Sequence, residues 1–330
     1  MDAWILDESP GSYRFGGIEA PRVGPEDVRV RVVTSALNHM DIWVTKGLPR
    51  PHTPHVPGAD GAGVVDAVGE RVTGVAVGDE VVLNPAVSCR RCPTCLSGES
   101  PLCRSFGIVG EHRWGTHAEL VVVPAPNVVP KPAGLSWEEA AAYPLCYLTA
   151  WRMLRRARLV AGETMLVVGV GGGVSSAGLA LGLAAGATVY ATSRDESKRQ
   201  AAVALGAAGA FDSASDDAWP VRAEVVFENV GAATWDRSLR ALAPGGRLVT
   251  CGGTAGSKVE ISLPRLFFKQ HEIIGSTMGS YAEFDEVTRL VAARKAAVVV
   301  DEVVDGLDRF PAALDRLQAG AQLGKIVVRH

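Results

Sequence analysis

The first third of the chain alternates polar and apolar residues over short runs, a pattern that half-buried β-strands produce. Residues 28–37 (VRVRVVTSAL) show it most clearly, and residues 116–124 (THAELVVVP) form a second such run. Two short apolar runs bounded by glycines, GAGVVDAVG and GDEVVLNP, lie in the interval. Because glycine and proline punctuate all of these runs, the pattern predicts an irregular, barrel-like β domain.

The pattern changes near Pro130, where helices begin to alternate with strands. A capping box, Ser136-Trp-Glu-Glu139, opens a helical stretch that Pro144 is expected to interrupt. Further strands are expected at residues 165–170, 187–193, 223–230 and 246–252, and helices are expected up to about residue 185, over residues 196–205 and around residues 235–242. This alternation predicts a doubly wound parallel sheet, and thus an α/β fold.

A shorter tail begins at residue 271 and is expected to hold one helix, one strand and a last helix. It closes on GKIVVRH (324–330), a run typical of an edge strand.

Composition narrows the class of protein. With 330 residues, 47% of them hydrophobic and 21% charged, the chain is long enough for two domains and is not a disordered one. The net charge of −3 comes without a basic stripe, which argues against a nucleic-acid partner. We see no signal peptide and no apolar stretch long enough to span a bilayer, so we expect a cytoplasmic protein without a membrane partner.

Four of the six cysteines lie close together in the sequence. Cys89, Cys92, Cys95 and Cys103 form the pattern C-x2-C-x2-C-x7-C. Such spacing lets four thiolates converge on one zinc ion and leaves no open position for water, as in structural zinc sites. The pattern therefore predicts one structural zinc; the alternative is a set of reduced cysteines without metal.

A glycine-rich turn follows the strand at 165–170. Its sequence, GVGGGVSS (169–176), lies between a strand and a helix, which is where dinucleotide-binding folds hold a pyrophosphate against backbone N–H groups. We expect Gly171, Gly172, Gly173 and Val174 to contact the cofactor. Ser175 stands where the last glycine of the fingerprint is expected, which predicts slightly looser helix–strand packing. The alternative is a glycine-rich linker in an α/β sheet.

The end of the next strand bears on the choice of cofactor. NAD enzymes place an acidic residue there, about 20 residues past the loop, to bind the ribose 2′-hydroxyl. This chain has Ser193 and Arg194 instead, with Lys198 one helical turn later, and Asp195 is expected to open the following helix. Ser, Arg and Lys can donate to a 2′-phosphate, so the interpretation is NADP(H). The alternative is that Arg194 is a solvated surface charge.

A cysteine quartet upstream of a glycine-loop α/β unit resembles the medium-chain dehydrogenase/reductase superfamily, which includes zinc-type alcohol dehydrogenases and quinone oxidoreductases. PHVPGADGAGVV (54–65) is similar to that family's P-x-x-P-G-H-E-x-x-G-x-V, and residues 227–256, GSTMG and GKIVV are similar to its later motifs. The resemblance covers nearly the whole chain.

The resemblance implies a GroES-like catalytic domain formed by residues 1–124 and 270–330, with the cysteine lobe at about residues 88–104. Residues 125–269 would form a Rossmann domain. It also implies an active site between the domains, a small-molecule substrate and a homodimer or homotetramer. Further cofactor contacts are implied for five residues: Thr149, Asn229, Gly252, Ser276 and Lys325.

The zinc-type alcohol dehydrogenases carry a second, catalytic zinc on three protein ligands. Carried over position by position, those ligands correspond to Asn38, Ala59 and Leu145, while Cys146 is one residue out of register. Alanine and leucine have no donor atom, so the resemblance implies that the catalytic zinc is lost. His52 and His55 lie in a proline-rich loop outside the motif.

Without a Lewis acid, hydride must go to an acceptor that stabilises its own negative charge. We therefore expect an NADPH-dependent reductase of a quinone, enone or enoyl-type C=C bond. The alternatives are a zinc-type alcohol dehydrogenase with atypical ligands and a non-catalytic NADPH-binding protein.

Several residues are candidates for the substrate site. The Asn38 amide could donate to a carbonyl or enolate oxygen, although Asn38 and Asp41 could equally cap a turn. His112 could protonate the product, although a surface histidine is the simpler interpretation. Trp43 and Tyr147 could stack on a flat acceptor or belong to the core, and Cys251 is expected to be a packing residue rather than a nucleophile.

Overall fold

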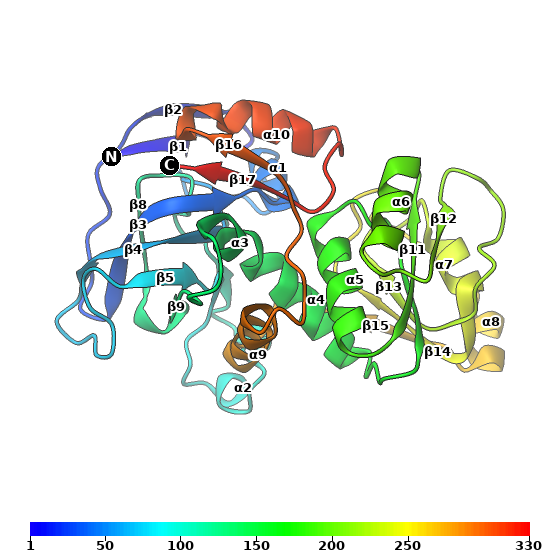
Figure 1. Ribbon diagram of the computed structural model, residues 1–330. Helices are drawn as coiled ribbons and strands as arrows, with labels where there is room; N and C mark the ends of the chain where they lie inside the picture. Colours follow the sequence, from blue (N-terminus) through cyan, green and yellow to red (C-terminus); the bar gives the residue numbers. More distant parts are fainter. The chain divides into compact units, whose positions relative to one another are not determined.

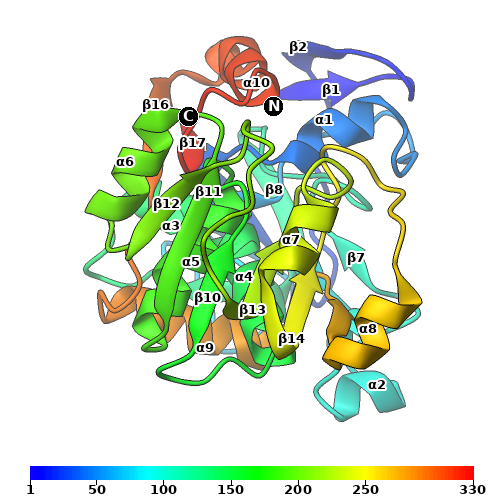
Figure 2. The same ribbon diagram turned by 90° about the vertical axis from the view of Figure 1, so that its right-hand side faces the viewer.

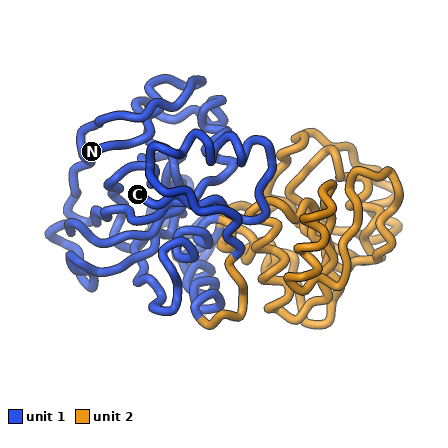
Figure 3. Tube along the Cα trace, turned by 45° about the horizontal axis from the view of Figure 1, so that its top comes forward, with its two compact units in different colours: residues 1–145, 279–292, 299–330 blue, residues 146–278, 293–298 orange.

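The computed structural model describes residues 1–330 and divides the chain into two compact units (Figure 3). Unit 1, blue in Figure 3, consists of Met1–Leu145, Gly279–Ala292 and Val299–His330. Unit 2, in orange, consists of Cys146–Met278 and Ala293–Val298. No helix in either unit combines the length and the apolar character needed to cross a membrane.

Unit 1 is built on a seven-stranded sheet of mainly antiparallel strands (Figure 1). Six strands follow one another in the order β16 (Val300–Asp305), β17 (Lys325–Arg329), β3 (Asp27–Ala36), β4 (Asp60–Val68), β5 (Glu80–Leu83) and β9 (Val128–Pro130), and β8 (Leu120–Pro124) pairs with β3. The alternation in β3 places Val28, Val30 and Val32 in a core that also contains Val121 and Val123 of β8. The predicted barrel-like β domain is thus confirmed.

Short elements complete unit 1. Two further strand pairs are β1 (Asp2–Leu6) with β2 (Tyr13–Gly17) and β6 (Ala86–Val87) with β7 (Gly107–Ile108). The helices are α1 (His39–Thr45), α2 (Pro93–Leu96), α3 (Trp137–Ala142), α9 (Tyr281–Ala292) and α10 (Phe310–Gln318), with 3-10 turns at Ser100–Leu102, Ala125–Asn127 and Leu307–Arg309.

Unit 2 contains a six-stranded sheet in which every neighbouring pair is parallel. Its order is β12 (Gly209–Asp212), β11 (Thr188–Ser193), β10 (Thr164–Val167), β13 (Ala223–Glu228), β14 (Leu242–Thr250) and β15 (Glu272–Gly275). Figure 2 shows β12, β11, β10, β13 and β14 side by side. The sheet order reverses between β10 and β13, which is the switch point of a doubly wound sheet and confirms the predicted α/β fold.

Five helices accompany this sheet. They are α4 (Pro144–Arg156), α5 (Gly173–Ala184), α6 (Glu196–Ala204), α7 (Trp235–Ala241) and α8 (Leu263–Lys269). Helix α5 packs on β10 and β11, α6 on β11 and β12, and α7 on β13 and β14.

The capping box at Ser136 forms as predicted. Glu139 N donates to Ser136 Oγ over 3.1 Å, and Ser136 N donates to Glu139 Oε2 over 2.9 Å. Helix α3 ends at Ala142, and Pro144 begins α4, where its missing N–H is not needed.

The division of the chain differs from the expected one at three places. Residues 125–145 belong to unit 1, because β9 pairs with β5 and α3 packs on β3 and β4. Residues 270–278 belong to unit 2, because β15 pairs with β14, and residues 293–298 also belong to unit 2. The C-terminal strand β17 is also not an edge strand, since it lies between β16 and β3.

Candidate functional site

The four clustered cysteines converge in unit 1, as their spacing predicts. Their sulfur atoms all lie within 4.8 Å of one another, with Sγ–Sγ distances of 3.5 Å for Cys92–Cys95 and Cys89–Cys103 and 3.9 Å for Cys89–Cys95. A tetrahedron of sulfurs about 2.3 Å from one zinc ion has edges of about 3.8 Å. The arrangement therefore fits a closed four-thiolate metal site.

Local structure explains how the cysteines meet. Cys92 precedes the short helix α2, Cys95 lies within it, and Cys103 follows the 3-10 turn Ser100–Leu102. The hydroxyl of Thr94 lies 2.9 Å from Cys92 Sγ, and this hydrogen bond, followed by one from the Cys95 backbone, lowers the pKa of Cys92 to about 6. A lowered pKa favours the thiolate, which is the form that binds zinc.

The glycine loop of unit 2 leaves room for an anion. Gly172 precedes α5 without any side-chain capping bond, and a side chain added at Gly172 would meet no atom within 4 Å. Gly169 has a positive φ of 73°, and a Cβ there would lie 2.7 Å from a Val230 methyl carbon. The backbone conformation thus requires glycine at Gly169, while the open space at Gly172 and the N–H groups at the start of α5 suit an anion.

Ser175 does not loosen the packing of α5, contrary to expectation. Its side chain is fully buried, and its hydroxyl lies 3.0 Å from both Val168 O and Asn229 Oδ1. The close helix–sheet approach occurs one turn later at Gly178, where a Cβ would lie 2.9 Å from the Phe227 ring.

Asp195 opens α6 as predicted. Its Oδ1 accepts from Ser197 N over 2.8 Å and from Lys198 N over 3.4 Å. Arg194 is exposed and forms no ion pair, whereas Arg199 donates to Ser193 O over 2.8 Å. After β11 the guanidinium of Arg194 thus has no ion-pair partner, and the carboxylate of the next residue, Asp195, caps α6.

The cofactor candidates of unit 2 share one edge of the sheet. They follow the carboxyl ends of five parallel strands: the glycines after β10, Ser193 at the end of β11, Asn229 after β13, Gly252 after β14 and Ser276 after β15. In open α/β sheets this edge is where ligands bind. Ser276 Oγ is buried there with no hydrogen-bond partner, which suits a ligand hydroxyl.

Two residues near this edge have structural contacts. Thr149 Oγ1 lies 3.7 Å from Met278 Sδ. Thr192, which sequence analysis did not single out, accepts at Oγ1 from Gly169 N over 3.1 Å and so holds the glycine loop to β11. The only sequence signal for this role of Thr192 was that it carries a hydroxyl one residue before the expected ribose-binding position.

In unit 1, Asp41 is a capping residue rather than a lining one. Its side chain is fully buried, and its carboxylate accepts from Asn38 N over 2.8 Å and from Gly58 N over 3.1 Å. His117 Nε2 lies 3.5 Å away. Because these groups surround the carboxylate, Asp41 fixes the start of α1, which corrects its placement among substrate contacts.

The side chain of Asn38 belongs to a buried polar cluster with Asp60 and Lys325. Asn38 Nδ2 donates to Asp60 Oδ2 over 2.9 Å, and Lys325 Nζ donates to that oxygen over 2.8 Å and to Asn38 Oδ1 over 2.7 Å. Lys325 also donates to Leu37 O over 2.7 Å. Three acceptors satisfy the three donors of an ammonium group, so the structure gives Lys325 a different place from the expected pyrophosphate contact.

The three positions carried over from the catalytic zinc meet around this cluster. Asp60 Oδ1 accepts from Leu145 N over 2.7 Å, and Ala59 lies fully buried in an apolar cluster with Leu6, Met40 and Val44. Asp60 and Lys325 are 0% and 2% exposed in their side chains. Next to the positions that correspond to zinc ligands, the positive charge is therefore the ammonium group of Lys325, which is paired with the carboxylate of Asp60. Asp60 was missed, although an acidic residue directly after Ala59 was the available signal.

The other candidates are less suited to chemistry. His112 is about half exposed, its Nδ1 accepts from Ile108 N over 3.2 Å, and partial burial lowers its pKa. Its neighbour Glu111 has a pKa raised by burial to about 7, which makes that carboxyl the better proton carrier at neutral pH. Burial raises the pKa of Cys251 to about 12, consistent with a packing role.

The two aromatic candidates differ in exposure. Tyr147 is 1% exposed and its hydroxyl donates to Ala297 O, so it is a core residue. Trp43 is 37% exposed.

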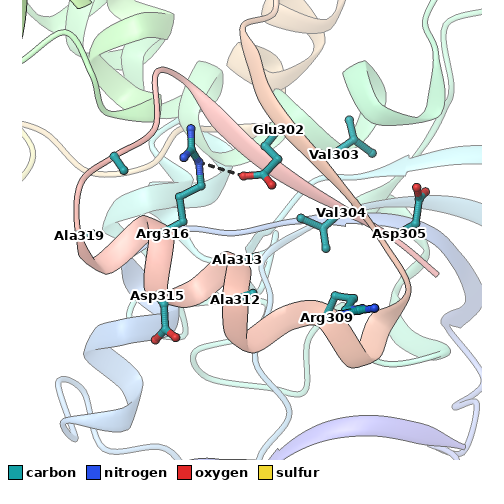
Figure 4. A pocket seen from close by; sticks show the side chains of 11 residues that line it. Glu302, Val303, Val304, Asp305, Arg309, Ala312, Ala313, Asp315, Arg316 and Ala319 are labelled. Carbon is teal, nitrogen blue, oxygen red and sulfur yellow. Dashed lines mark ion pairs between the residues drawn. The ribbon is translucent and has the colours of Figure 1, made fainter.

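A cavity of about 700 Å³ lies in unit 1 between β16 and α10 (Figure 4). Arg316 and Glu302 form an ion pair of 2.9 Å at one end of it, and Val304 and Ala313 line its apolar part. None of the predicted site residues lines this cavity.

Comparison with known proteins supports the same class. Residues 24–133 match the family described as the alcohol dehydrogenase GroES-like domain, and residues 173–293 match the zinc-binding dehydrogenase family. A zinc-type alcohol dehydrogenase-like protein of Schizosaccharomyces pombe, C1773.06c, is 31% identical over 93% of this chain and 92% of its own length.

Solved structures agree in fold. The crystal structure of an NAD-dependent alcohol dehydrogenase is 40% identical, with a TM-score of 0.94 over 100% of both chains. The 2-octenoyl-CoA carboxylase reductase CinF, solved with NADP and 2-octenoyl-CoA, is 28% identical, with a TM-score of 0.90 over 98% of this chain and 83% of that one.

A glycine-loop parallel sheet joined to a GroES-like β domain with a cysteine lobe defines an oxidoreductase that uses a nicotinamide cofactor. The chain belongs to the medium-chain dehydrogenase/reductase superfamily, as its motifs indicate.

Proposed function

We propose that the protein is an NADPH-dependent reductase of a conjugated acceptor, namely a quinone, an enone or an enoyl-type C=C bond, and that it works without a catalytic metal. The observation that carries the proposal is the Lys325–Asp60–Asn38 cluster. It occupies the place where the zinc-dependent relatives need three metal ligands, and two of the carried-over residues, Ala59 and Leu145, have no donor side chain.

The buried cluster supplies polarity in place of a metal. Lys325 and Asp60 fix the orientation of the Asn38 amide, because its oxygen must face the ammonium and its nitrogen the carboxylate. The Lys325–Asp60 pair is neutral as a whole and its donors are already bound, so the cluster lacks the free positive charge of a metal and can act on an acceptor only through its fixed dipoles. Such support suffices only for an acceptor that spreads the charge by conjugation. The 2-octenoyl-CoA bound to CinF is an acceptor of this kind.

The cofactor would be held at the carboxyl edge of the sheet in unit 2. When bound, NADPH supplies the hydride. The glycine loop and the start of α5 would bind the pyrophosphate, and the buried hydroxyl of Ser276 would bind a ribose hydroxyl. Arg194 is exposed and free to pair with a 2′-phosphate, which supports NADP over NAD.

Alcohol oxidation is the second candidate, because the 40% identical relative is an NAD-dependent alcohol dehydrogenase. Two measurements separate the candidates. Steady-state rates are compared for a quinone, an enone, an enoyl thioester and a secondary alcohol, each with the matching form of NADP and of NAD. Bound zinc is counted on the same preparation.

We expect turnover of at least one conjugated acceptor with NADPH, poor oxidation of the secondary alcohol, and one zinc per chain. Fast alcohol oxidation that a chelator abolishes, with two zincs per chain, would overturn the proposal. Tight NADPH binding without turnover of any acceptor would favour a non-catalytic binding protein.

A further inference from the structure

A carboxylate without a cation lies buried at the end of β13. The side chain of Glu228 is 0% exposed. Its Oε1 accepts from the backbone N–H groups of Val230 and Gly231, over 2.6 and 3.1 Å. Its Oε2 accepts from the hydroxyls of Thr234 and Ser238, over 2.9 and 2.5 Å. No Lys, Arg or His nitrogen pairs with it.

These four donors match the acceptors of an ionised carboxylate, with two donors for each oxygen. Backbone N–H groups can only donate, so Oε1 carries no proton, and the two hydroxyls complete the shell around Oε2. Burying a charge is costly unless hydrogen bonds or a counterion compensate it. Here hydrogen bonds supply the compensation, and the carboxylate of Glu228 has no paired cation.

The charge lies at the edge of the sheet that the cofactor residues share. Glu228 directly precedes Asn229, whose Oδ1 lies 3.0 Å from Ser175 Oγ at the start of α5. The field of the carboxylate also reaches the end of β14, since, after burial and the Cys146 charge, it contributes to the raised pKa of Cys251. Glu228 thus acts on the region where the cofactor residues follow β10, β13 and β14.

We propose that Glu228 raises the affinity of the site for the oxidised, cationic nicotinamide relative to its affinity for the neutral reduced form. The inference rests on the nicotinamide cofactor of the proposed function, and it does not depend on the acceptor or on the 2′-phosphate. When hydride leaves the reduced ring, two electrons and one proton go to the acceptor and the ring gains one positive charge. A fixed anion at the edge of the sheet that holds the cofactor lowers the free energy of that product state.

The test compares the dissociation constants of the two redox forms. Glu228→Gln keeps the shape, because its amide oxygen can accept from Val230 N and Gly231 N while its NH₂ group donates to the two hydroxyls. Dissociation constants for the oxidised and reduced forms are measured by calorimetry, with whichever nicotinamide pair the unmodified protein binds. We expect the oxidised form to bind roughly tenfold more weakly and the reduced form to change little. That ratio equals a rise of about 30 mV in the potential of the bound couple.

A matched control lies at the opposite end of the same strand. Glu224 begins β13, and its Oε2 accepts from Thr164 N over 2.7 Å. Glu224→Gln removes the same charge far from the carboxyl edge and should leave the ratio unchanged. Glu228→Asp, which keeps the charge, should also keep the ratio even if both affinities fall.

A second variant keeps the inference testable if Glu228→Gln does not fold. Asn229→Asp retains an acceptor for Ser175 and adds a negative charge beside Glu228 once both carboxylates are ionised. Because like charges raise carboxyl pKa values, its ratio is measured at about pH 9. It should shift the ratio in the opposite direction, toward the oxidised form. Equal weakening of both forms in Glu228→Gln, or an unchanged ratio in Asn229→Asp, would show that Glu228 has only a structural role. Because no acceptor takes part, failure of the proposed reductase activity cannot be confused with failure of this inference.

Discussion

At the scale of single residues, the strongest constraint in unit 1 is the ion pair between Lys325 and Asp60. Both side chains are removed from water, so each depends on the other and on Asn38, Leu37 and Leu145 for compensation. A buried charge that loses its partner costs far more than an exposed one. The pair therefore also anchors β17 to the start of β4 and to the residues before α1.

Removing one partner should be much worse than removing both. Lys325→Met should lower the free energy of unfolding by about 3–5 kcal/mol, because the Asp60 carboxylate stays buried and uncompensated. The double variant Lys325→Met/Asp60→Asn should recover much of that loss. Unfolding in urea measures both values.

Arg22→Met serves as the control, because Arg22 and its partner Glu19 are largely exposed and such pairs contribute about 0–1 kcal/mol. Equal losses in the single and double variants would show that the two charges are not energetically coupled.

Arg194 should decide between the two nicotinamide dinucleotides. Arg194→Ala should weaken NADPH binding by about 1.5–3 kcal/mol, the range for a hydrogen bond to a charged group, and leave NADH nearly unaffected. Calorimetric titration with both dinucleotides measures the difference. As a control, Arg240→Ala removes an exposed arginine of α7 that pairs with Asp236. If the unmodified protein binds NADH and NADPH equally, the strand end has been misinterpreted.

Roles that depend on sequence neighbours were accessible to sequence analysis, whereas roles that depend on distant partners were not. The helix start at Asp195 could be predicted because its hydrogen-bond partners lie two and three residues away. Lys325 and Asp60 are 265 positions apart in the sequence, and the residues around each one do not indicate that the two side chains form an ion pair. The family resemblance assigned Lys325 to the C-terminal GKIVV motif, but it could not show which acceptors surround the ammonium group.

At the scale of elements, the cysteine lobe is held by a four-residue helix and a 3-10 turn. Neither element is long enough to be stable alone in water. The helix α2 also has no buried residue. A metal bound by the four thiolates would therefore supply most of the order in this lobe.

Metal analysis should find about one zinc per chain, and Cys95→Ser should lose it. Without the metal, limited proteolysis should cut within residues 88–104 first, because the short elements there have no core of their own. Cys251→Ser is the matched control and should keep the zinc, since Cys251 belongs to unit 2 and is not one of the four clustered cysteines. Retention of zinc by Cys95→Ser would place the metal elsewhere.

Most strands and helices could be predicted from periodicity, but the division into units could not. The alternation of β3 and the apolar runs of β10 and β13 report burial, which is a local property of the sequence. Assignment of β9, α3 and β15 to a unit depends on which strand each one packs against, and that is a long-range property. The same limit explains β17, whose short run resembled an edge strand although it is paired on both sides.

At the scale of the whole molecule, the chain enters unit 2 after unit 1 has begun and returns to unit 1 to complete it. Strand β17 pairs with β3 only after the whole of β10 to β15 has intervened. An unfolded unit 2 would be a long flexible loop between paired strands of unit 1, and closing such a loop has an entropic cost. Unit 2 is continuous apart from residues 293–298, so unit 1 depends on unit 2 more through chain connectivity than unit 2 depends on unit 1.

Cofactor binding should reveal this organisation. NADPH at about 100 times its dissociation constant should stabilise the state that binds it by about 2.7 kcal/mol. In hydrogen-exchange mass spectrometry, the strands β10, β11 and β13 should then exchange up to about a hundredfold more slowly. Strands β4 and β5 of unit 1 should gain less protection, because only the loop-closure coupling reaches them. Equal protection of both sheets would mean that the molecule unfolds as one cooperative unit. Protection confined to unit 1 would contradict the assignment of the cofactor to the carboxyl edge of the parallel sheet.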